Sequence, residues 1–295
     1  MGKLARSYAL FTASVRVLRA HRGLAWFPVL AGLAGLFVAG VFLTPAFFLS
    51  HVEIADGGRP TAGSWVLLAA FYVASAFVAI FFNAALISQA DVALRGGVPA
   101  VGAGLAAAAR RWPALLGWAA VSATVSLVLR AIEERLGFLG QFVAGLIGLA
   151  WRLTTFLVLP VVVLEGAGVK AGVRRSVELF RRTWGENVAG GIGIGLIGFI
   201  LSLAGYAVLV LAGFLLGGGP ATVFVCLGLA LVWSVLVAVF TSTLSGIYQT
   251  ALYRYAAEGV VAGEFADADF AGVSPRGERV AARPRGDRGR ADPIP

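Results

Sequence analysis

The sequence predicts an all-α polytopic membrane protein. Hydrophobic residues make up 59% of its 295 residues and charged residues only 13%, whereas about a quarter of the residues in a soluble domain are charged. Six apolar segments are each long enough to cross a bilayer core of about 30 Å, which takes roughly 20 helical residues. None of them alternates between polar and apolar residues over about ten positions, as the strands of a membrane barrel do.

The six segments define one predicted membrane domain over residues 1–255. The predicted spans are residues 24–49, 65–90, 113–129, 138–164, 188–216 and 221–253. A charged stretch of about 20 residues precedes the first span, which is longer than the apolar region of a cleavable signal. We therefore expect the first span to remain in the mature protein.

Basic residues gather on one side of these spans. They occupy the N-terminal segment, the connections from the second to the third and from the fourth to the fifth span, and the end of the sixth, whereas the opposite side has only Arg59, Arg130 and Arg135. The positive-inside rule predicts cytoplasmic termini and a place in the cell (inner) membrane. The net charge of +9 then indicates binding to anionic lipid headgroups, because the bases follow one leaflet and do not form the footprint of a nucleic-acid-binding domain.

The segments before the first, third and fifth spans share an amphipathic pattern. Apolar residues recur at i, i+4, i+7 and i+11 on one helical face. The three sets are Leu4, Tyr8, Phe11 and Val15; Val101, Leu105, Ala108 and Trp112; and Val173, Val177, Phe180 and Trp184. This repetition predicts three units, each a cytoplasmic interfacial helix followed by a hairpin of two spans. The alternative is that any basic helix that enters a membrane looks amphipathic.

Residues 256–295 are predicted to form a disordered cytoplasmic tail. The segment 258–270 contains four acids and no base, and 276–290 contains six arginines among Pro, Gly and Ala. Such a composition does not bury enough apolar surface to order itself. A solvated tail is favoured over a partner-binding segment.

One candidate polar site lies inside the predicted membrane domain. A charge near the bilayer centre costs about 3 kcal/mol on insertion scales, so we expect Arg152 to point into the bundle. Its candidate partners are Gln141, Asn83 and Gln249. A structural arginine bonded to amides and carbonyls is favoured over a site for a substrate or an anion.

A strip of small residues in the fifth span predicts a helix-packing face. The strip consists of Gly191, Gly195, Gly198, Ser202 and Gly205, at steps of four, three, four and three. In lipid, small residues let helix backbones approach closely and gain dispersion contacts. Packing is favoured over a role beside a conduction path, because glycine supplies no selectivity.

Chemical motifs are missing from the sequence, which predicts no catalytic, metal or cofactor site. There is one cysteine, Cys226, inside the sixth span, and the two histidines fall on opposite sides of the predicted membrane. Asp91 and Glu165 lie at cytoplasmic ends of spans and are expected to pair with Arg95, Lys170 or Arg174. The sequence therefore favours a protein that is not an enzyme.

The string Trp184-Gly185-Glu186-Asn187 is interpreted as an elbow between an interfacial helix and the fifth span. Gly185 would end the first helix in a left-handed conformation, Asn187 would cap the next helix, and Glu186 would lie near its positive N-terminus. Gly23 and Pro113 occupy the comparable joints before the first and third spans.

Several strings resemble a family of uncharacterised prokaryotic integral membrane proteins with about six spans, classed as a domain of unknown function. They are Phe82-Asn83-Ala84-Ala85-Leu86, Trp118-Ala119, Glu133-Glu134-Arg135, the stretch 160–166, and the stretch 174–188 with its Trp-Gly-Glu-Asn-Val string. The resemblance covers roughly residues 3–260 and implies fold and location only. Arg152 departs from the family pattern, in which this position is usually uncharged.

These observations favour a non-enzymatic scaffold or lipid-interacting membrane component. Its basic interfacial helices would bind anionic headgroups, and its glycine faces would pack the bundle, a homo-oligomer or a membrane partner. The alternative function is a small permease with a polar site around Arg152.

Overall fold

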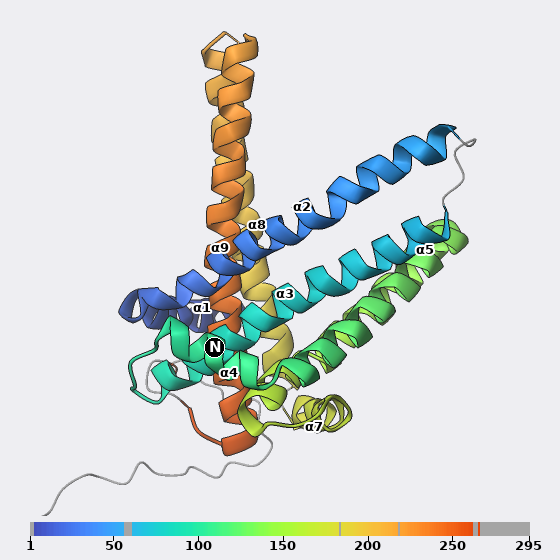
Figure 1. Cartoon of the computed structure of the whole chain (residues 1–295). Helices are drawn as coiled ribbons and strands as arrows, with labels where there is room; N and C mark the ends of the chain where they lie inside the picture. Colours follow the sequence, from blue (N-terminus) through green and yellow to red (C-terminus); the bar gives the residue numbers. More distant parts are fainter. Residues whose placement is uncertain (1–2, 56–60, 183, 218, 262–264, 266–295) are drawn as a thin grey trace, which may run out of the picture.

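The computed structural model describes residues 3–55, 61–182, 184–217, 219–261 and 265, which form helices and no strands (Figure 1). The elements are α1 (Lys3–Ala20), the short 3-10 helix η1 (Arg22–Ala25), α2 (Trp26–Ala55), α3 (Ala62–Leu94), α4 (Val101–Arg110), α5 (Trp112–Thr154), α6 (Val158–Pro160), the π-helical turn η2 (Val161–Glu165), α7 (Val169–Arg182), α8 (Trp184–Leu215) and α9 (Pro220–Glu258).

Six helical segments of the described chain are long and apolar enough to cross a membrane. They are Arg22–Phe47, Ala62–Leu94, Trp112–Ile132, Gly140–Glu165, Ile194–Leu215 and Pro220–Glu258. The predicted number of apolar segments of crossing length is therefore confirmed, and so is the all-helical class.

The long helix α5 reverses direction along its length. The rings of Trp118 and Trp151 stack with centroids 5.9 Å apart, although a straight helix would separate them by about 50 Å. A Cβ placed on Gly148 would also lie 3.5 Å from a methyl carbon of Leu129. The reversal therefore falls between Leu129 and Gly148, and the two halves of α5 lie side by side.

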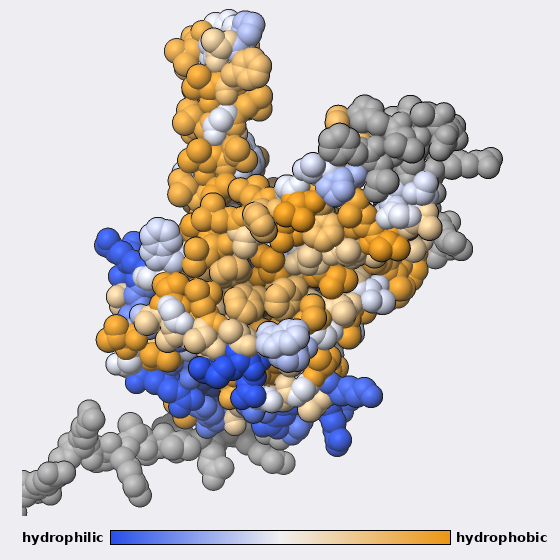
Figure 2. Space-filling view, in the orientation of Figure 1, coloured by the Kyte–Doolittle hydropathy of each residue, from blue (hydrophilic) through white to orange (hydrophobic). Residues whose placement is uncertain are grey.

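Burial divides the molecule into two levels, which we call the base and the arms. The base comprises α1, η1, α4, α6, η2, α7 and the ends of α3 and α9 from Ala84 and Thr243 onward, and most of the core lies here. The arms are the remaining lengths of α2, α3, α5, α8 and α9, which expose many large apolar side chains. Figure 2 shows hydrophilic residues gathered over the base and hydrophobic residues covering the arms.

The arms diverge from the base as two groups. The pair α8 and α9 stands apart from α2, α3 and α5 (Figure 1). Glycines mark the close contacts: a Cβ on Gly246 of α9 would collide with Leu86 of α3, and one on Gly205 of α8 would collide with the indole of Trp233 on α9. The first contact therefore brings the two groups together at the base, and the second joins α8 to α9.

The predicted interfacial helices α1, α4 and α7 all belong to the base. On α1, Leu10 and Val17 are buried, whereas Tyr8, on the predicted apolar face, is 68% exposed. On α7, Ser176 and Leu179 are buried, one position away from the predicted face. These helices pack against the protein with one side, because the ends of α3, α8 and α9 lie beside them, and their predicted apolar faces are turned partly outward.

The helix α9 runs past the predicted start of the tail at residue 256. α9 continues to Glu258, and Phe265 is fully buried in the core of the base. Residues 262–264 and 266–295 lie outside the described chain.

The junction between α7 and α8 differs from the predicted elbow. α8 begins at Trp184, so Gly185 lies in its first turn and does not end the preceding helix. The side chains of residues 182–193 lie outside what the structure describes, so the capping roles of Glu186 and Asn187 stay predictions. At the comparable joint, Pro113 lies in the first turn of α5, where its missing N–H is tolerated.

Candidate functional site

The predicted fourth span is broken inside the base. α5 ends at Thr154, residues 155–157 form turns, and the chain continues through α6 and η2 to Glu165. Pro160 explains part of the break, because it lacks the N–H that would bond the carbonyl of Phe156 in a continuous helix. Residues Leu157–Val163 are buried, so the freed backbone groups have little access to water.

Two buried side chains satisfy the carbonyls that the break leaves free. Gln249 of α9 donates its Nε2–H to the carbonyl oxygen of Phe156. Ser176 of α7 donates its hydroxyl to the carbonyl oxygen of Thr154 at 2.7 Å. Broken helices in membrane proteins require such replacement donors. The two bonds therefore hold α7 and α9 against the break at the end of α5.

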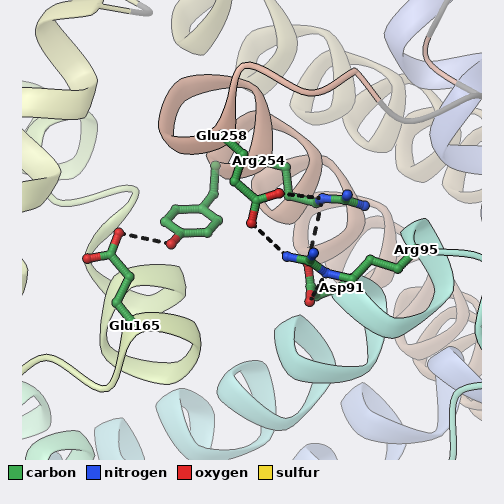
Figure 3. Close-up of polar contacts among 6 residues, drawn as sticks. Asp91, Arg95, Glu165, Arg254 and Glu258 are labelled. Atoms are coloured by element: carbon green, nitrogen blue, oxygen red, sulfur yellow. Dashed lines mark hydrogen bonds and ion pairs between the residues drawn. The ribbon is translucent and has the colours of Figure 1, made fainter. Parts of the chain in front are cut away.

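Four charged side chains at the ends of α3 and α9 form a network, which we call the ion ring (Figure 3). Arg95 Nε lies 2.8 Å from Asp91 Oδ2, and Arg95 Nη2 lies 2.6 Å from Glu258 Oε1. Arg254 Nε lies 3.7 Å from Asp91 Oδ1 and 3.4 Å from Glu258 Oε2. The ring joins the ends of α3 and α9 and has no net charge.

The members of the ion ring differ in burial. The side chain of Arg254 is 8% exposed and that of Asp91 14%, whereas Arg95 is 50% exposed. The hydrogen bonds to Asp91 and Glu258 raise the pKa of Arg95 above the ordinary value for arginine. Arg254 Nη1 is buried without a hydrogen-bond partner in the described chain. The Asp91–Arg254 contact is therefore the part of the ring most shielded from solvent.

A second branch of the network surrounds Glu165. Its Oε1 accepts a hydrogen bond from the hydroxyl of Tyr253 at 2.9 Å and lies 3.5 Å from Arg175 Nε. Arg175 also donates to Glu178 at 3.1 Å, and that hydrogen bond is the main cause of its raised pKa. The predicted pair Asp91–Arg95 is confirmed, whereas Glu165 pairs with Arg175 and not with Lys170 or Arg174.

Charges of the two signs are placed differently in the base. Each of the four acids whose side chains are described, Asp91, Glu165, Glu178 and Glu258, forms an ion pair. A larger set of basic side chains is exposed and has no hydrogen bond or ion pair with described residues: Arg19, Arg22, Arg110, Arg111, Lys170, Arg174 and Arg181. The outer surface of the base is therefore positive.

The predicted polar site around Arg152 does not form. Arg152 lies in the last turn of α5 with its side chain exposed, as Gln141 does on the same helix. Gln249 bonds the carbonyl of Phe156, and Asn83 lies half-buried beside Gly246 on α9. The expectation that Arg152 points into the bundle is wrong, because α5 ends two residues later at the base and the arginine reaches its surface.

The glycine strip of α8 is placed in part against α9. A Cβ on Gly198 would lie 2.7 Å from Thr241 Cγ2, and one on Gly205 would collide with Trp233. Ser202 bonds the carbonyl of Gly198 in its own helix, and a Cβ on Gly195 would meet nothing within 4 Å. The side-chain surroundings of Gly191 lie outside the described chain.

An apolar cleft lies between the two groups of arms. α2, α3 and α9 enclose a volume of about 590 Å³, lined by residues such as Val29, Leu36, Phe82 and Val235. Asn83 and Ser242 are its polar lining residues. The volume falls within the range of about 300–1,000 Å³ that is usual for small-molecule sites.

The described side chains leave two kinds of surface open to a ligand. No group of three or more His, Cys, Asp or Glu residues in the described part of the chain could hold a metal ion. The acids of the base are already paired with arginines, which act as anchors between helices. Exposed basic side chains and the apolar cleft are the surfaces that a ligand can reach.

Sequence reasoning missed three members of the site. Glu258 falls in the predicted tail, although its spacing of four residues from Arg254 is a signal for a helical ion pair. Ser176 was not among the candidate residues. Pro160 could have indicated an unpaired carbonyl at Phe156, but nothing in the sequence shows which donor reaches it.

The fold and the site define a multi-pass helical membrane protein with a polar base. The chain belongs to the Family of unknown function (DUF6159), whose profile matches residues 62–263. The predicted resemblance to a membrane-protein family of unknown function is confirmed at this level, although the match begins at residue 62 and not near residue 3. No curated protein and no solved structure matches the chain.

Replacing Gln249 by Leu should destabilise the base. The change leaves the buried carbonyl of Phe156 without a donor, which costs about 1–3 kcal/mol. Equilibrium unfolding in mixed detergent micelles measures this loss. Gln141→Leu, at an exposed glutamine of α5, is the matched control and should change stability by less than about 0.5 kcal/mol. Equal stability of the two variants would contradict this role for Gln249.

Asp91→Asn should destabilise the protein more than Arg95→Gln. Asp91 Oδ1 lies 3.7 Å from Nε of the buried Arg254, and removing one partner of a buried ion pair costs about 3–5 kcal/mol. Arg95 is half exposed, and exposed ion pairs contribute about 0–1 kcal/mol. The same unfolding measurement compares the two variants, and a larger loss for Arg95→Gln would show that the outer side of the ring dominates.

Proposed function

We propose that this protein is a non-enzymatic component of the cell membrane that binds anionic lipid headgroups with its base. The observation that carries the proposal is the placement of charge: each acid whose side chain is described forms an ion pair, while Arg19, Arg110, Lys170, Arg174 and Arg181 are exposed and have no ion pair with a described residue. Unpaired bases near a membrane surface attract anionic lipid at about 1 kcal/mol each.

The division into base and arms supports a position in the bilayer. From Trp65 to Asn83, α3 rises about 27 Å, close to the thickness of a hydrocarbon core of about 30 Å. Trp65 is 61% exposed at one end, and Trp26 and Trp112 are exposed at the base, where aromatic belts form. In this arrangement the arms are three hairpins in the hydrocarbon and α1, α4 and α7 lie at the headgroup level.

The base and both termini are proposed to face the cytoplasm. This orientation rests on the sequence, because basic residues are more frequent on the side of the spans where the base lies, and the positive-inside rule assigns that side to the cytoplasm. A homo-oligomer packed through the exposed arms is compatible with this placement. The alternative function, a permease, lacks its predicted polar site, because Asn83, Gln141 and Gln249 do not gather around Arg152.

Cysteines placed at Val98 and Ala62 should react from opposite sides of the membrane. Val98 is 87% exposed at the base and Ala62 is exposed at the far end of α3. In a Cys226→Ala background, an impermeant thiol reagent added to intact cells should label Ala62→Cys, and should label Val98→Cys only after the cells are opened. Labelling of both in intact cells would overturn the proposed orientation.

Arg174→Gln and Arg181→Gln should each weaken binding of anionic lipid about fivefold. This follows from about 1 kcal/mol per base. Binding is measured as the enrichment of phosphatidylglycerol over phosphatidylcholine around protein in mixed-lipid nanodiscs. The control is Arg130→Gln, which removes one charge from the arms, where Arg130 bonds Tyr72. If the wild-type protein showed no enrichment, the proposed function would fail.

A further inference from the structure

We infer that the cleft between α2, α3 and α9 holds one acyl chain of an anionic phospholipid whose headgroup lies beside Arg22. The inference rests on the proposed function, since it names a particular lipid site on the same base. The shape of the cleft is the first observation that supports it. Its walls come from the two diverging groups of arms, which leave an apolar volume of about 590 Å³ between them.

The cleft extends along the arms from the level of the base. Pro28, Leu86 and Ser242 line it next to the buried core, and Leu36 and Leu231 line it farther away. Eight residues of α2 from Pro28 to Leu36 rise about 12 Å. The lining therefore extends about 12 Å along α2, and one of its ends is next to the base.

Asn83 lines the cleft, and Arg22 lies six residues before Pro28, which lines the end of the cleft next to the base. η1 packs against both α3 and α9, the helices that form the cleft with α2. η1 contains the exposed Arg22, whose guanidinium has no partner among the described residues. The amide of Asn83 also lines the cleft and makes no hydrogen bond with a described residue.

The order of these groups matches a phospholipid in the cytoplasmic leaflet. An anionic phosphate pairs with the guanidinium of an arginine, which offers several donors in one plane. The glycerol esters would meet the amide of Asn83, and an acyl chain would lie against Val29, Phe82 and Val235. A purely apolar partner helix would leave Arg22 and Asn83 without a counterpart, so charge complementarity selects the phospholipid.

Gly32 offers a direct way to fill the cleft. It lines the cleft, and a Cβ placed on it would meet no atom within 4 Å. A side chain at this position therefore projects into the cleft without displacing a helix. Gly35 lies three residues further along α2, outside the cleft lining, and a Cβ there also meets nothing within 4 Å. The two glycines form a matched pair for substitution.

The experiment measures phosphatidylglycerol retained by the full-length protein after delipidation and re-addition of the lipid, by native mass spectrometry. The wild-type protein should retain one phosphatidylglycerol tightly. Gly32→Leu should weaken its retention at least tenfold, while Gly35→Leu should leave it unchanged. Arg22→Gln should abolish the preference for phosphatidylglycerol over phosphatidylcholine and leave the site accessible to either lipid. Unchanged thermal unfolding of Gly32→Leu shows that the fold is retained.

The possible outcomes separate this inference from the proposed function. If Gly32→Leu binds phosphatidylglycerol as tightly as Gly35→Leu, the cleft inference is overturned even when the base still enriches anionic lipid in nanodiscs. If retention depends on Gly32 but is equal for both lipids in the wild-type protein, the anionic headgroup is overturned. Retention of dihexanoyl phosphatidylglycerol as tight as that of the long-chain lipid would overturn the acyl-chain site, because only the headgroup would then bind.

Discussion

The carbonyl of Phe156 is the constraint on which the arrangement of the base depends. Pro160 removes its helical donor, and the surrounding chain is buried, so another element must supply an N–H. Gln249 does so from α9, while Ser176 of α7 serves the neighbouring carbonyl of Thr154. These two bonds fix α7 and the lower part of α9 against the broken helix. The partners of Glu165 then follow, because Tyr253 lies one turn beyond Gln249 on the same helix.

The second organising feature is the way in which the base separates its charges. Asp91 and Glu258 pair with two arginines in the ion ring, and Glu165 and Glu178 pair with Arg175. Pairing matters most for Asp91, which is 14% exposed, since an unpaired buried charge is costly. The side chains of Glu165, Glu178 and Glu258 are 33%, 50% and 33% exposed. Exposed basic residues of the base such as Arg174 and Arg181 have no ion pair with a described acid. A positive surface thus arises as a consequence of packing as well as of composition.

Much of the fold could be predicted from the sequence, because hydropathy and helical periodicity are local properties. The six apolar segments and the pair Asp91–Arg95, four residues apart on one helix, belong to this group. The site around Arg152 was predicted wrongly for a related reason. Hydropathy placed Arg152 inside a continuous span, but the break after Thr154 ends that helix at the base. The course of α9 to Glu258 and the burial of Phe265 were missed because their partners are distant in sequence.

By itself the sequence determined that this chain is helical, contains six segments of membrane-crossing length and has an excess of bases beside them. These properties depend on composition and on spacing within one helix. Only the tertiary structure decided which donor reaches the carbonyl of Phe156, which acids close the ion ring, and that α2, α3 and α9 leave an apolar cleft between them. Each depends on where helices diverge or cross, as at Gly246 and Leu86, and a crossing point is set by contacts between segments far apart in the chain.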